Sequence, residues 1–300
     1  MNFIKSIFKS SIAKNLTVLA GGSALAQVFG ILFSPLPSRI YSPADFGILG
    51  YVMAIAGPAS LVASLKYDMA IVTENDDEEV KHVQSLNFAI IFGITLLLGI
   101  ILAIYIWLST TQYNQGASNT DLLYSLPIVL FSAIYNVYYS RFNRDQLYKQ
   151  MAIAQIVRRL SIVAVQLLWS FISISSFGLI MGNVLGVVFP TLLMVYAMRN
   201  DINFELPKIS NLKRVAIKYI DFPKYTAPQS LLNLVSGQLP IFFLGYYFSL
   251  VEVGAFYFSL KIVQMPAMFI GLSVGQVFYK ECVKVLDNIP KINKRFIKTT

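Results

Sequence analysis

The chain has 300 residues, of which 56% are hydrophobic and only 13% are charged, and its formal net charge is +9. A soluble domain carries about 25% charged residues, so this composition excludes an ordinary soluble domain. The apolar residues form long continuous runs instead of alternating with polar ones, which excludes a membrane β-barrel. The predicted fold class is therefore an all-α integral membrane protein.

Eight apolar stretches have the length of about 20 residues that a helix needs to cross about 30 Å of hydrocarbon. They cover residues 16–37, 46–65, 83–108, 122–140, 151–172, 176–198, 226–248 and 252–277. A short polar hinge that begins SRIYSPADFG at Ser38 joins the first two. In the sixth stretch, Gly178, Gly182 and Gly186 recur at a spacing that favours close helix packing.

Polar segments separate these stretches. An acidic segment, TENDDEEVKH, covers residues 73–82 and is expected to be a loop, and a basic loop is expected where RFNRDQLYKQ covers residues 141–150. Residues 199–225 break the apolar pattern, yet apolar residues between Ile209 and Ile220 fall on one helical face. This periodicity predicts an amphipathic surface helix that joins two halves of the chain.

The positive charges indicate the orientation in the membrane. If eight spans alternate and the N-terminus is cytoplasmic, all but two of the 24 Lys and Arg residues fall on the cytoplasmic side, and both termini lie there too. The two exceptions are Arg39 and Lys261. This arrangement of charge explains the basic net charge by membrane orientation, so we do not expect a nucleic-acid partner.

The chain contains an internal repeat. With a shift of 207 residues, YSPADFGILGYVMAI at residues 41–55 aligns with FSLVEVGAFYFSLKI at residues 248–262. Ser42 then matches Ser249, Asp45 matches Glu252, and Gly47 matches Gly254. Six spans separate the two copies, which predicts two lobes of the same orientation, as in two-lobed transporters.

The repeat predicts the domain organisation. We expect a six-helix lobe over residues 1–206, a cytoplasmic amphipathic linker over residues 207–225, and the first two helices of a second lobe over residues 226–300. On this prediction the second lobe is incomplete.

Several segments resemble a known family. The segment PSRIYSPADFG at residues 37–47, the acidic stretch after the second span, Gln238-Leu239-Pro240 and VGQVFY at residues 274–279 are similar to bacterial lipopolysaccharide and capsule flippases. These flippases belong to the multidrug/oligosaccharidyl-lipid/polysaccharide exporter superfamily. The similarity extends over nearly the whole chain.

The resemblance implies transport of undecaprenyl-pyrophosphate-linked oligosaccharide across the bacterial inner membrane, for lipopolysaccharide (O-antigen) or capsule synthesis. It also implies alternating access driven by a proton or sodium gradient, without a bound cofactor. The partners that the resemblance implies are the lipid-linked oligosaccharide and membrane lipid, with a polysaccharide polymerase and chain-length proteins as further expected partners. No nucleotide-binding loop occurs in the sequence, so direct use of ATP is not expected.

Charged residues at or inside spans are the first candidates for a substrate cavity, because a charge deep in a membrane is usually functional or paired. Arg39 either lines the outer vestibule or pairs with Asp45, and Lys261 either contacts phosphate or glycan or extends to an interface near Glu252. Lys66 and Asp68, at the inner end of the second span, either line the substrate cavity or are explained by ion pairing or by extension of the side chain to the interface. Polar residues inside spans are weaker candidates, because each could equally form a helix–helix hydrogen bond. These are Gln27, Asn136, Asn183, Asn233 and Gln238.

Arg141, Arg144, Arg158 and Arg159 form an inner basic cluster. Orientation in the membrane explains it, and it could also gather anionic pyrophosphate at the mouth of the cavity.

Two other functions compete with flipping. A drug or cation exporter of the same superfamily would place acidic residues inside its spans, whereas the acids here lie at span ends and in loops. A membrane enzyme of polysaccharide synthesis would need a large catalytic loop, whereas the expected outer loops are short. One histidine and one cysteine provide neither a metal site nor a hydrolytic dyad, so we expect no enzyme.

Overall fold

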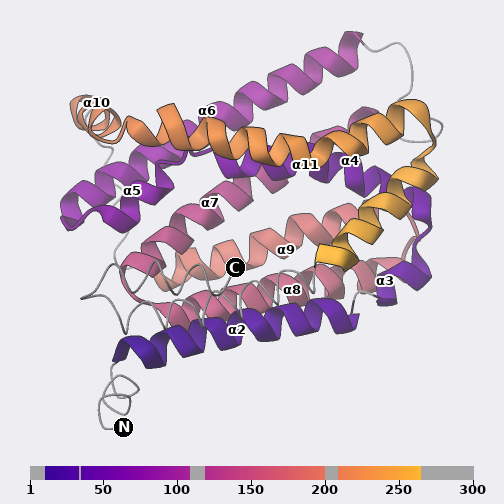
Figure 1. Ribbon diagram of the computed structural model, residues 1–300, viewed down its shortest axis with the longest axis horizontal. Helices are drawn as coiled ribbons and strands as arrows, with labels where there is room; N and C mark the ends of the chain where they lie inside the picture. The colour runs from indigo at the N-terminus through magenta and orange to yellow at the C-terminus, as the bar shows by residue number, and fades with distance from the viewer. Residues whose placement is uncertain (1–10, 34, 109–118, 200–208, 265–300) are drawn as a thin grey trace, which may run out of the picture. The chain divides into compact units, whose positions relative to one another are not determined.

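The computed structural model describes residues 11–33, 35–108, 119–199 and 209–264, and every regular element in these ranges is helical (Figure 1). In chain order the elements are α2 (Ser11–Phe33), α3 (Pro35–Ile40), α4 (Pro43–Val62), α5 (Asp68–Thr73), α6 (Asp77–Leu108), the 3-10 helix η1 (Asn119–Tyr124), α7 (Ser125–Arg144), α8 (Tyr148–Ser170), α9 (Ser176–Ala197), α10 (Ile209–Lys218), the π-helix η2 (Phe222–Thr226) and α11 (Ala227–Tyr247). Residues 250–264 are also helical. The prediction of an all-α fold is confirmed for these residues.

The chain divides into two compact units, Met1–Tyr257 and Phe258–Thr300, which are described separately. All the elements from α2 to α11 belong to the first unit, as does the beginning of the helix at residues 250–264. Of the second unit, the described residues are 258–264.

Five helices are long and apolar enough to cross a membrane, which makes the chain a multi-pass helical membrane protein. They are Pro43–Val62, Asp77–Leu108, Thr120–Arg144, Tyr148–Ser170 and Ser176–Ala197. These helices correspond to the second to sixth predicted spans. The first, seventh and eighth predicted spans fall on α2, α11 and the helix from residue 250, which are not among the five. The predicted count of eight is therefore not confirmed, and residues 265–277 of the eighth lie outside the described residues.

Local chemistry determines where α4 and α6 begin. Ser42 and Asp45 form a capping box, in which the Ser42 hydroxyl accepts from the Asp45 amide and the Asp45 carboxylate accepts from the Ser42 amide at 3.0 Å. Three acidic residues occupy the first turn of α6, where they face the positive end of the helix dipole. The prediction of a loop over residues 73–82 is therefore wrong, because α6 begins at Asp77 and only residues 74–76 separate it from α5.

The core of the first unit lies where α7, α8 and α9 pack together. Phe142, Met151 and Met194 are buried there and belong to one apolar cluster. The glycines of α9 allow α8 to come close, since a Cβ on Gly182 would lie 2.9 Å from the carbonyl oxygen of Ile162. The packing interpretation of the glycines in the sixth span is confirmed.

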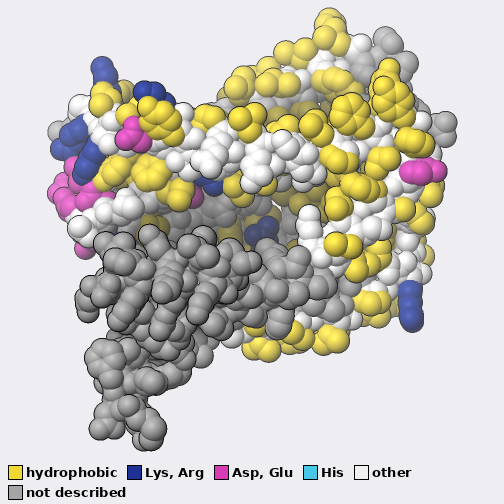
Figure 2. Space-filling model, viewed as in Figure 1, with side chains coloured by type: hydrophobic (Ala, Val, Ile, Leu, Met, Phe, Trp, Pro, Cys, Tyr) yellow, Lys and Arg dark blue, Asp and Glu magenta, His cyan; other side chains and the backbone are white. Residues whose placement is uncertain are grey.

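One face of α6 is apolar and exposed. Phe92 is 57% exposed, Leu96 is 68% exposed and Trp107 is 83% exposed. An exposed apolar face of this length is stable in lipid, where the backbone polar groups are already paired within the helix. Many of the yellow side chains in Figure 2 belong to exposed apolar residues of this kind.

The predicted amphipathic linker helix is α10, which packs against α6. Val215 is buried, whereas Ile209, at the first position of the helix, and Ile217 are exposed. After α10 the chain passes through the π-helical turn η2 into α11.

Candidate functional site

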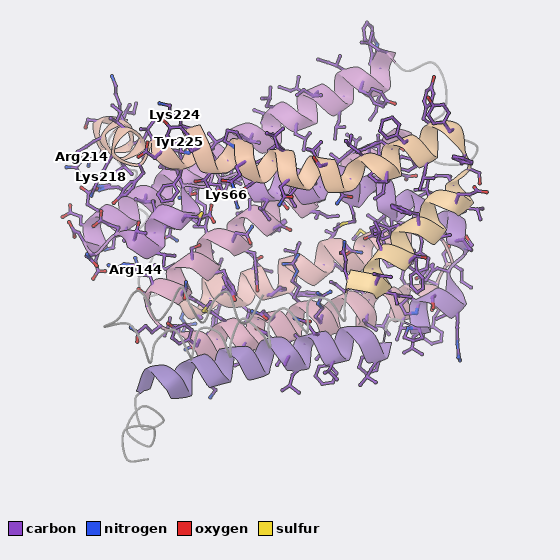
Figure 3. The ribbon with its side chains drawn as sticks, in the orientation of Figure 1. Lys66, Arg144, Arg214, Lys218, Lys224 and Tyr225 are labelled. Carbon is purple, nitrogen blue, oxygen red and sulfur yellow. The ribbon has the colours of Figure 1, made fainter. Side chains whose placement is uncertain are left out.

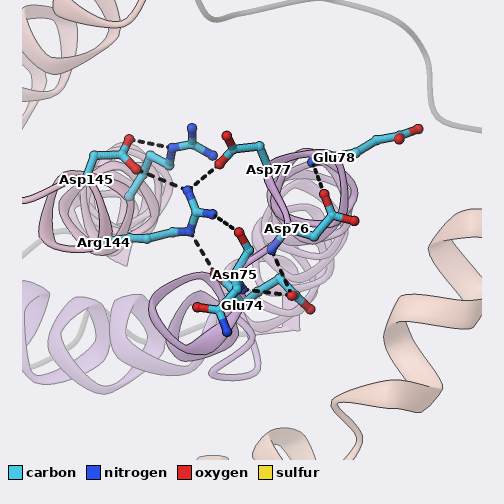
Figure 4. Close-up of polar contacts among 8 residues, drawn as sticks. Glu74, Asn75, Asp76, Asp77, Glu78, Arg144 and Asp145 are labelled. Carbon is cyan, nitrogen blue, oxygen red and sulfur yellow. Dashed lines mark hydrogen bonds and ion pairs between the residues drawn. The ribbon is translucent and has the colours of Figure 1, made fainter.

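Arg144, at the end of α7, lies at the centre of a group of polar contacts (Figure 4). Its guanidinium donates to the carboxylate of Asp77 at 2.6 Å and to that of Asp145 at 3.2 Å. It also donates to two backbone carbonyls, those of Glu74 and Asn75, at 2.8 Å each. The planar fork of an arginine suits several acceptors at once, so Arg144 joins the α7–α8 turn to the α5–α6 connection.

The helix α10 is tied to the same acidic segment. Lys218 donates to the Glu74 carboxylate at 2.5 Å, the Tyr219 hydroxyl donates to it as well, and Arg214 donates to the Glu79 carboxylate at 2.5 Å. Tyr67 adds a hydrogen bond of 2.9 Å from its hydroxyl to the carbonyl oxygen of Ala216. Figure 3 shows Arg214, Lys218, Lys224 and Tyr225 gathered at one end of the first unit, with Arg144 at the same end.

We call the residues Glu74, Asp77, Glu79, Arg144, Asp145, Arg214 and Lys218 the ion-pair cluster. Its bonds favour the ionised forms of its members. The pKa of Glu74 is lowered from 4.5 to about 2, chiefly by the hydrogen bonds from Lys218 and Tyr219. The pKa of Lys218 is raised by its side-chain hydrogen bonds with Glu74 and Tyr219. The Arg144 hydrogen bond likewise lowers the pKa of Asp77. The cluster is therefore a set of ion pairs that holds α6, α7, α10 and the α5–α6 connection together.

Arg158 and Arg159 lie in a different place from Arg141 and Arg144. Because α8 begins at Tyr148 and ends at Ser170, the two residues are near the middle of a candidate membrane span. The interpretation of all four arginines as one inner basic cluster is therefore wrong. Arg141 pairs with Asp145 at 2.7 Å, and Arg144 belongs to the ion-pair cluster.

We call Arg158 and Arg159 the mid-span arginine pair. Among the described residues neither forms an ion pair with a carboxylate. The Arg158 guanidinium lies 5.3 Å from the centroid of the Tyr135 ring, as a cation–π contact, and Arg159 is close enough to Tyr257 to interact electrostatically. Each charge at the centre of a span costs about 2.5–3.5 kcal/mol on insertion, so two unneutralised arginines are expected to serve a function.

The surroundings of the mid-span arginine pair can receive an anion. Figure 2 shows a recess beneath α11 on one face of the first unit, with a dark blue cationic side chain inside it. Tyr135 stacks on Tyr139, with ring centroids 5.8 Å apart, and Gln155 donates to the Tyr139 hydroxyl at 2.8 Å. Guanidinium groups bind phosphate and pyrophosphate through paired hydrogen bonds, so this position is the best candidate in the described residues for an anionic group inside the membrane.

The structure gives Arg39 and Asp45 separate surroundings. Arg39 lies in the last turn of α3 and is exposed, and among the described residues it forms no ion pair. Asp45 instead caps α4. The proposed pairing of these two residues is therefore wrong, and a role of Arg39 in the outer vestibule stays a prediction.

Lys66 and Asp68 lie at the break between α4 and α5. Lys66 has a φ of 64°, in the left-handed region, and Asp68 accepts a hydrogen bond of 2.5 Å from the Ser64 hydroxyl. The two do not pair with each other among the described ion pairs. Figure 3 places Lys66 toward the same end of the first unit as the ion-pair cluster.

The polar candidates inside the other spans have varied surroundings. Gln27 in α2 and Gln238 in α11 are partly exposed, and Asn233 in α11 is exposed. Asn183 in α9 donates to the carbonyl of Leu179 in its own helix at 2.9 Å. Asn136 in α7 is partly buried. Lys261 is partly buried in the helix of residues 250–264, and its part in a cavity stays a prediction.

Sequence reasoning missed the ion-pair cluster as a unit. The acidic segment and the basic linker helix were each recognised, and the predicted topology places both on the cytoplasmic side. Opposite charges on two segments of the same side are the signal that could have indicated the pairing of Glu74 with Lys218 and of Glu79 with Arg214.

Comparisons with known proteins give one family. No curated protein and no solved structure matches the chain. A family model described as "Polysaccharide biosynthesis protein" matches residues 37–300, which is most of the chain and includes all five candidate spans. This multi-pass membrane protein belongs to the polysaccharide biosynthesis protein family.

Proposed function

We propose that the protein is a flippase that carries undecaprenyl-pyrophosphate-linked oligosaccharide from the inner to the outer leaflet of the bacterial inner membrane. In this proposal the substrate is a repeat unit of lipopolysaccharide or capsule, and a proton or sodium gradient drives alternating access. Residues 1–206 and 226–300 act as parts of two lobes, and residues 207–225 join them. Both termini lie in the cytoplasm.

One observation carries the proposal: two adjacent arginines lie in mid-span without a carboxylate partner among the described residues. A lipid-linked sugar brings a pyrophosphate into the membrane, and that pyrophosphate needs cationic donors along its path. The mid-span arginine pair supplies two guanidinium groups at the depth where such a group has lost its water. Membership of a polysaccharide biosynthesis family supports a glycan as the cargo.

The distribution of acidic residues argues against a drug or cation exporter. Within the five candidate spans, every Asp or Glu lies in the first three positions of its helix, at residues 45, 77–79 and 121. Acids at such positions cap helices and pair in the ion-pair cluster, so they are poorly placed to bind a cation in the middle of the membrane.

A first experiment tests the function in cells. Deletion of the gene should leave lipid-linked oligosaccharide on the inner leaflet and abolish surface glycan. Normal surface glycan together with altered drug sensitivity would contradict the proposal and favour an exporter.

A second experiment tests the arginine pair. Substitution of both arginines by glutamine, Arg158→Gln with Arg159→Gln, should abolish glycan export at an undiminished protein level, because removal of two charges from a span makes insertion easier. The double lysine variant should retain part of the export, since it keeps the charge but not the planar fork. The control is Arg199→Gln, since Arg199 is exposed beyond α9. Full export by the double glutamine variant would refute the assignment.

A further inference from the structure

The two copies of the internal repeat touch each other through equivalent residues. Gly47 and Gly254 are 207 residues apart and match in the repeat, as do Pro43 and Leu250. A Cβ on Gly47 would overlap the carbonyl oxygen of Leu250, and a Cβ on Gly254 would overlap the carbonyl oxygen of Pro43. The contact is therefore reciprocal. Gly47 packs on the backbone of Leu250, and its equivalent Gly254 packs on the backbone of Pro43, which is the equivalent of Leu250.

The same local symmetry extends along both helices. Gly50 and Tyr257 are also 207 residues apart, and a Cβ on Gly50 would lie 3.3 Å from the Cβ of Tyr257. Residues 43, 47 and 50 of one helix thus contact residues 250, 254 and 257 of the other over two turns. Glycines at this spacing let two helix backbones approach closely, with Cα–H groups directed at carbonyl oxygens.

Both helices begin with a serine that donates to the carboxylate three residues later. Ser42 pairs with Asp45 at the start of α4, and in the second copy the Ser249 amide donates to the Glu252 carboxylate at 3.1 Å while the Ser249 hydroxyl also bonds to it. The caps hold the two helix ends in a defined shape independently of each other. The surfaces that meet are therefore preformed, and they can separate without unfolding either helix.

The position of the contact relates it to the candidate site. It lies at the α3 end of the first unit, opposite the end that carries α5 and α10 (Figure 1). The predicted topology makes this the outer side. At the inner edge of the contact, Tyr257 interacts electrostatically with Arg159 of the mid-span arginine pair.

We propose that the reciprocal contact of Gly47 and Gly254 is the outer gate of the transport path, closed in this structure, and that it must open for cargo to leave. This inference rests on the proposed function, since it assigns a path to the same site. A seal made by two backbones without intervening side chains excludes water in the closed state and leaves a wide gap when the helices part.

A disulfide tests whether the contact must open. In a Cys282→Ser background, which removes the single cysteine of the chain, Gly50→Cys with Tyr257→Cys places two Cβ atoms about as close as in a disulfide, from their 3.3 Å separation. The matched control is Ile162→Cys with Gly186→Cys in α8 and α9, where the Cβ separation is also 3.3 Å. We call the variant with Gly50→Cys and Tyr257→Cys the gate pair. Its oxidation should abolish the flipping of lipid-linked oligosaccharide in proteoliposomes, and its reduction should restore flipping. The oxidised control pair should keep its rate. Undiminished flipping by a fully oxidised gate pair would overturn the proposal.

A second measurement does not depend on transport. Labelling of Tyr257→Cys by a membrane-impermeant maleimide from outside should rise several-fold when Gly47→Ala forces the helices apart. Gly57→Ala in the same helix is the control, because a Cβ there meets no atom within 4 Å, and it should leave labelling unchanged. Equal labelling with Gly47→Ala and Gly57→Ala would overturn the gate. A rise in labelling with Gly47→Ala, together with no flipping of oligosaccharide by the wild-type protein, would instead support the gate and refute the proposed function.

Discussion

Removal of the Glu74 carboxylate should loosen α10 from the rest of the first unit. In the folded protein this carboxylate accepts hydrogen bonds from Lys218 and Tyr219 and from the amides of Asn75 and Asp76, at 2.8 and 3.1 Å respectively for the two amides. Glu74→Ala leaves these donors without their shared acceptor. Water can reach the amides of the exposed residues Asn75 and Asp76, so the main loss is the contact with α10.

The size of the effect follows from exposure. The Glu74 side chain is 11% exposed and that of Lys218 is 48% exposed, so the pair lies between a buried and a surface ion pair. Surface pairs contribute up to about 1 kcal/mol and hydrogen bonds to charged groups about 1.5–3 kcal/mol. We expect Glu74→Ala to lower the free energy of unfolding by about 1.5–2 kcal/mol, which corresponds to a fall in Tm of about 3–8 °C for a chain of this size.

Thermal unfolding of the detergent-purified protein at pH 7 and low salt measures this loss. Glu78→Ala is the matched control, since Glu78 is exposed and forms no ion pair among the described residues. The difference between Glu74→Gln and the wild type should vanish as the pH falls from about 4.5 to about 2, because the wild-type carboxyl becomes protonated over this interval. Equal Tm values for Glu74→Ala and Glu78→Ala would refute the reasoning.

Two further variants test the packing and the centre of the ion-pair cluster. Phe142→Ala should lower the free energy of unfolding by about 3–5 kcal/mol, because Phe142 is fully buried between α7, α8 and α9; the same loss with Leu232→Ala, at a residue that is 70% exposed, would contradict this account. Arg144→Lys should lower the Tm although it keeps the charge, because one ammonium cannot serve two carboxylates and two carbonyls at once. Arg199→Lys at an exposed site should have little effect, and similar Tm values for the two lysine variants would count against the assigned role of Arg144.

Hydropathy predicts the helices of this chain well but their ends poorly. The second to sixth spans were predicted because an apolar run of about 20 residues is long enough to cross the membrane as a helix. Arg158 and Arg159 were grouped with Arg141 and Arg144 because they lie near the start of the predicted span at residues 151–172, whereas α8 begins at Tyr148 and has the two arginines near its middle. The acidic segment was mistaken for a loop for a similar reason, since Asp77 and its neighbours are the first turn of α6.

The contacts between distant segments could be predicted only where the sequence repeats itself. Gly47 and Gly254 were matched by the 207-residue shift, but a match between copies does not show that the copies touch. The ion pairs of Glu74 and Glu79 depend on how α10 packs on α6, and that packing depends on the shapes of many side chains at once.

The ties of α10 also bear on the order in which the chain assembles during synthesis. Its ionic and hydrogen-bonding partners, Glu74, Glu79 and Tyr67, all precede it in the sequence. The ribosome has therefore delivered every component of this junction before α11 emerges, so the junction can form before α11 is synthesised. Helices that follow then dock on a surface that has already formed. The helix that begins at residue 250 brings Gly254 to Gly47 after α11 has been synthesised.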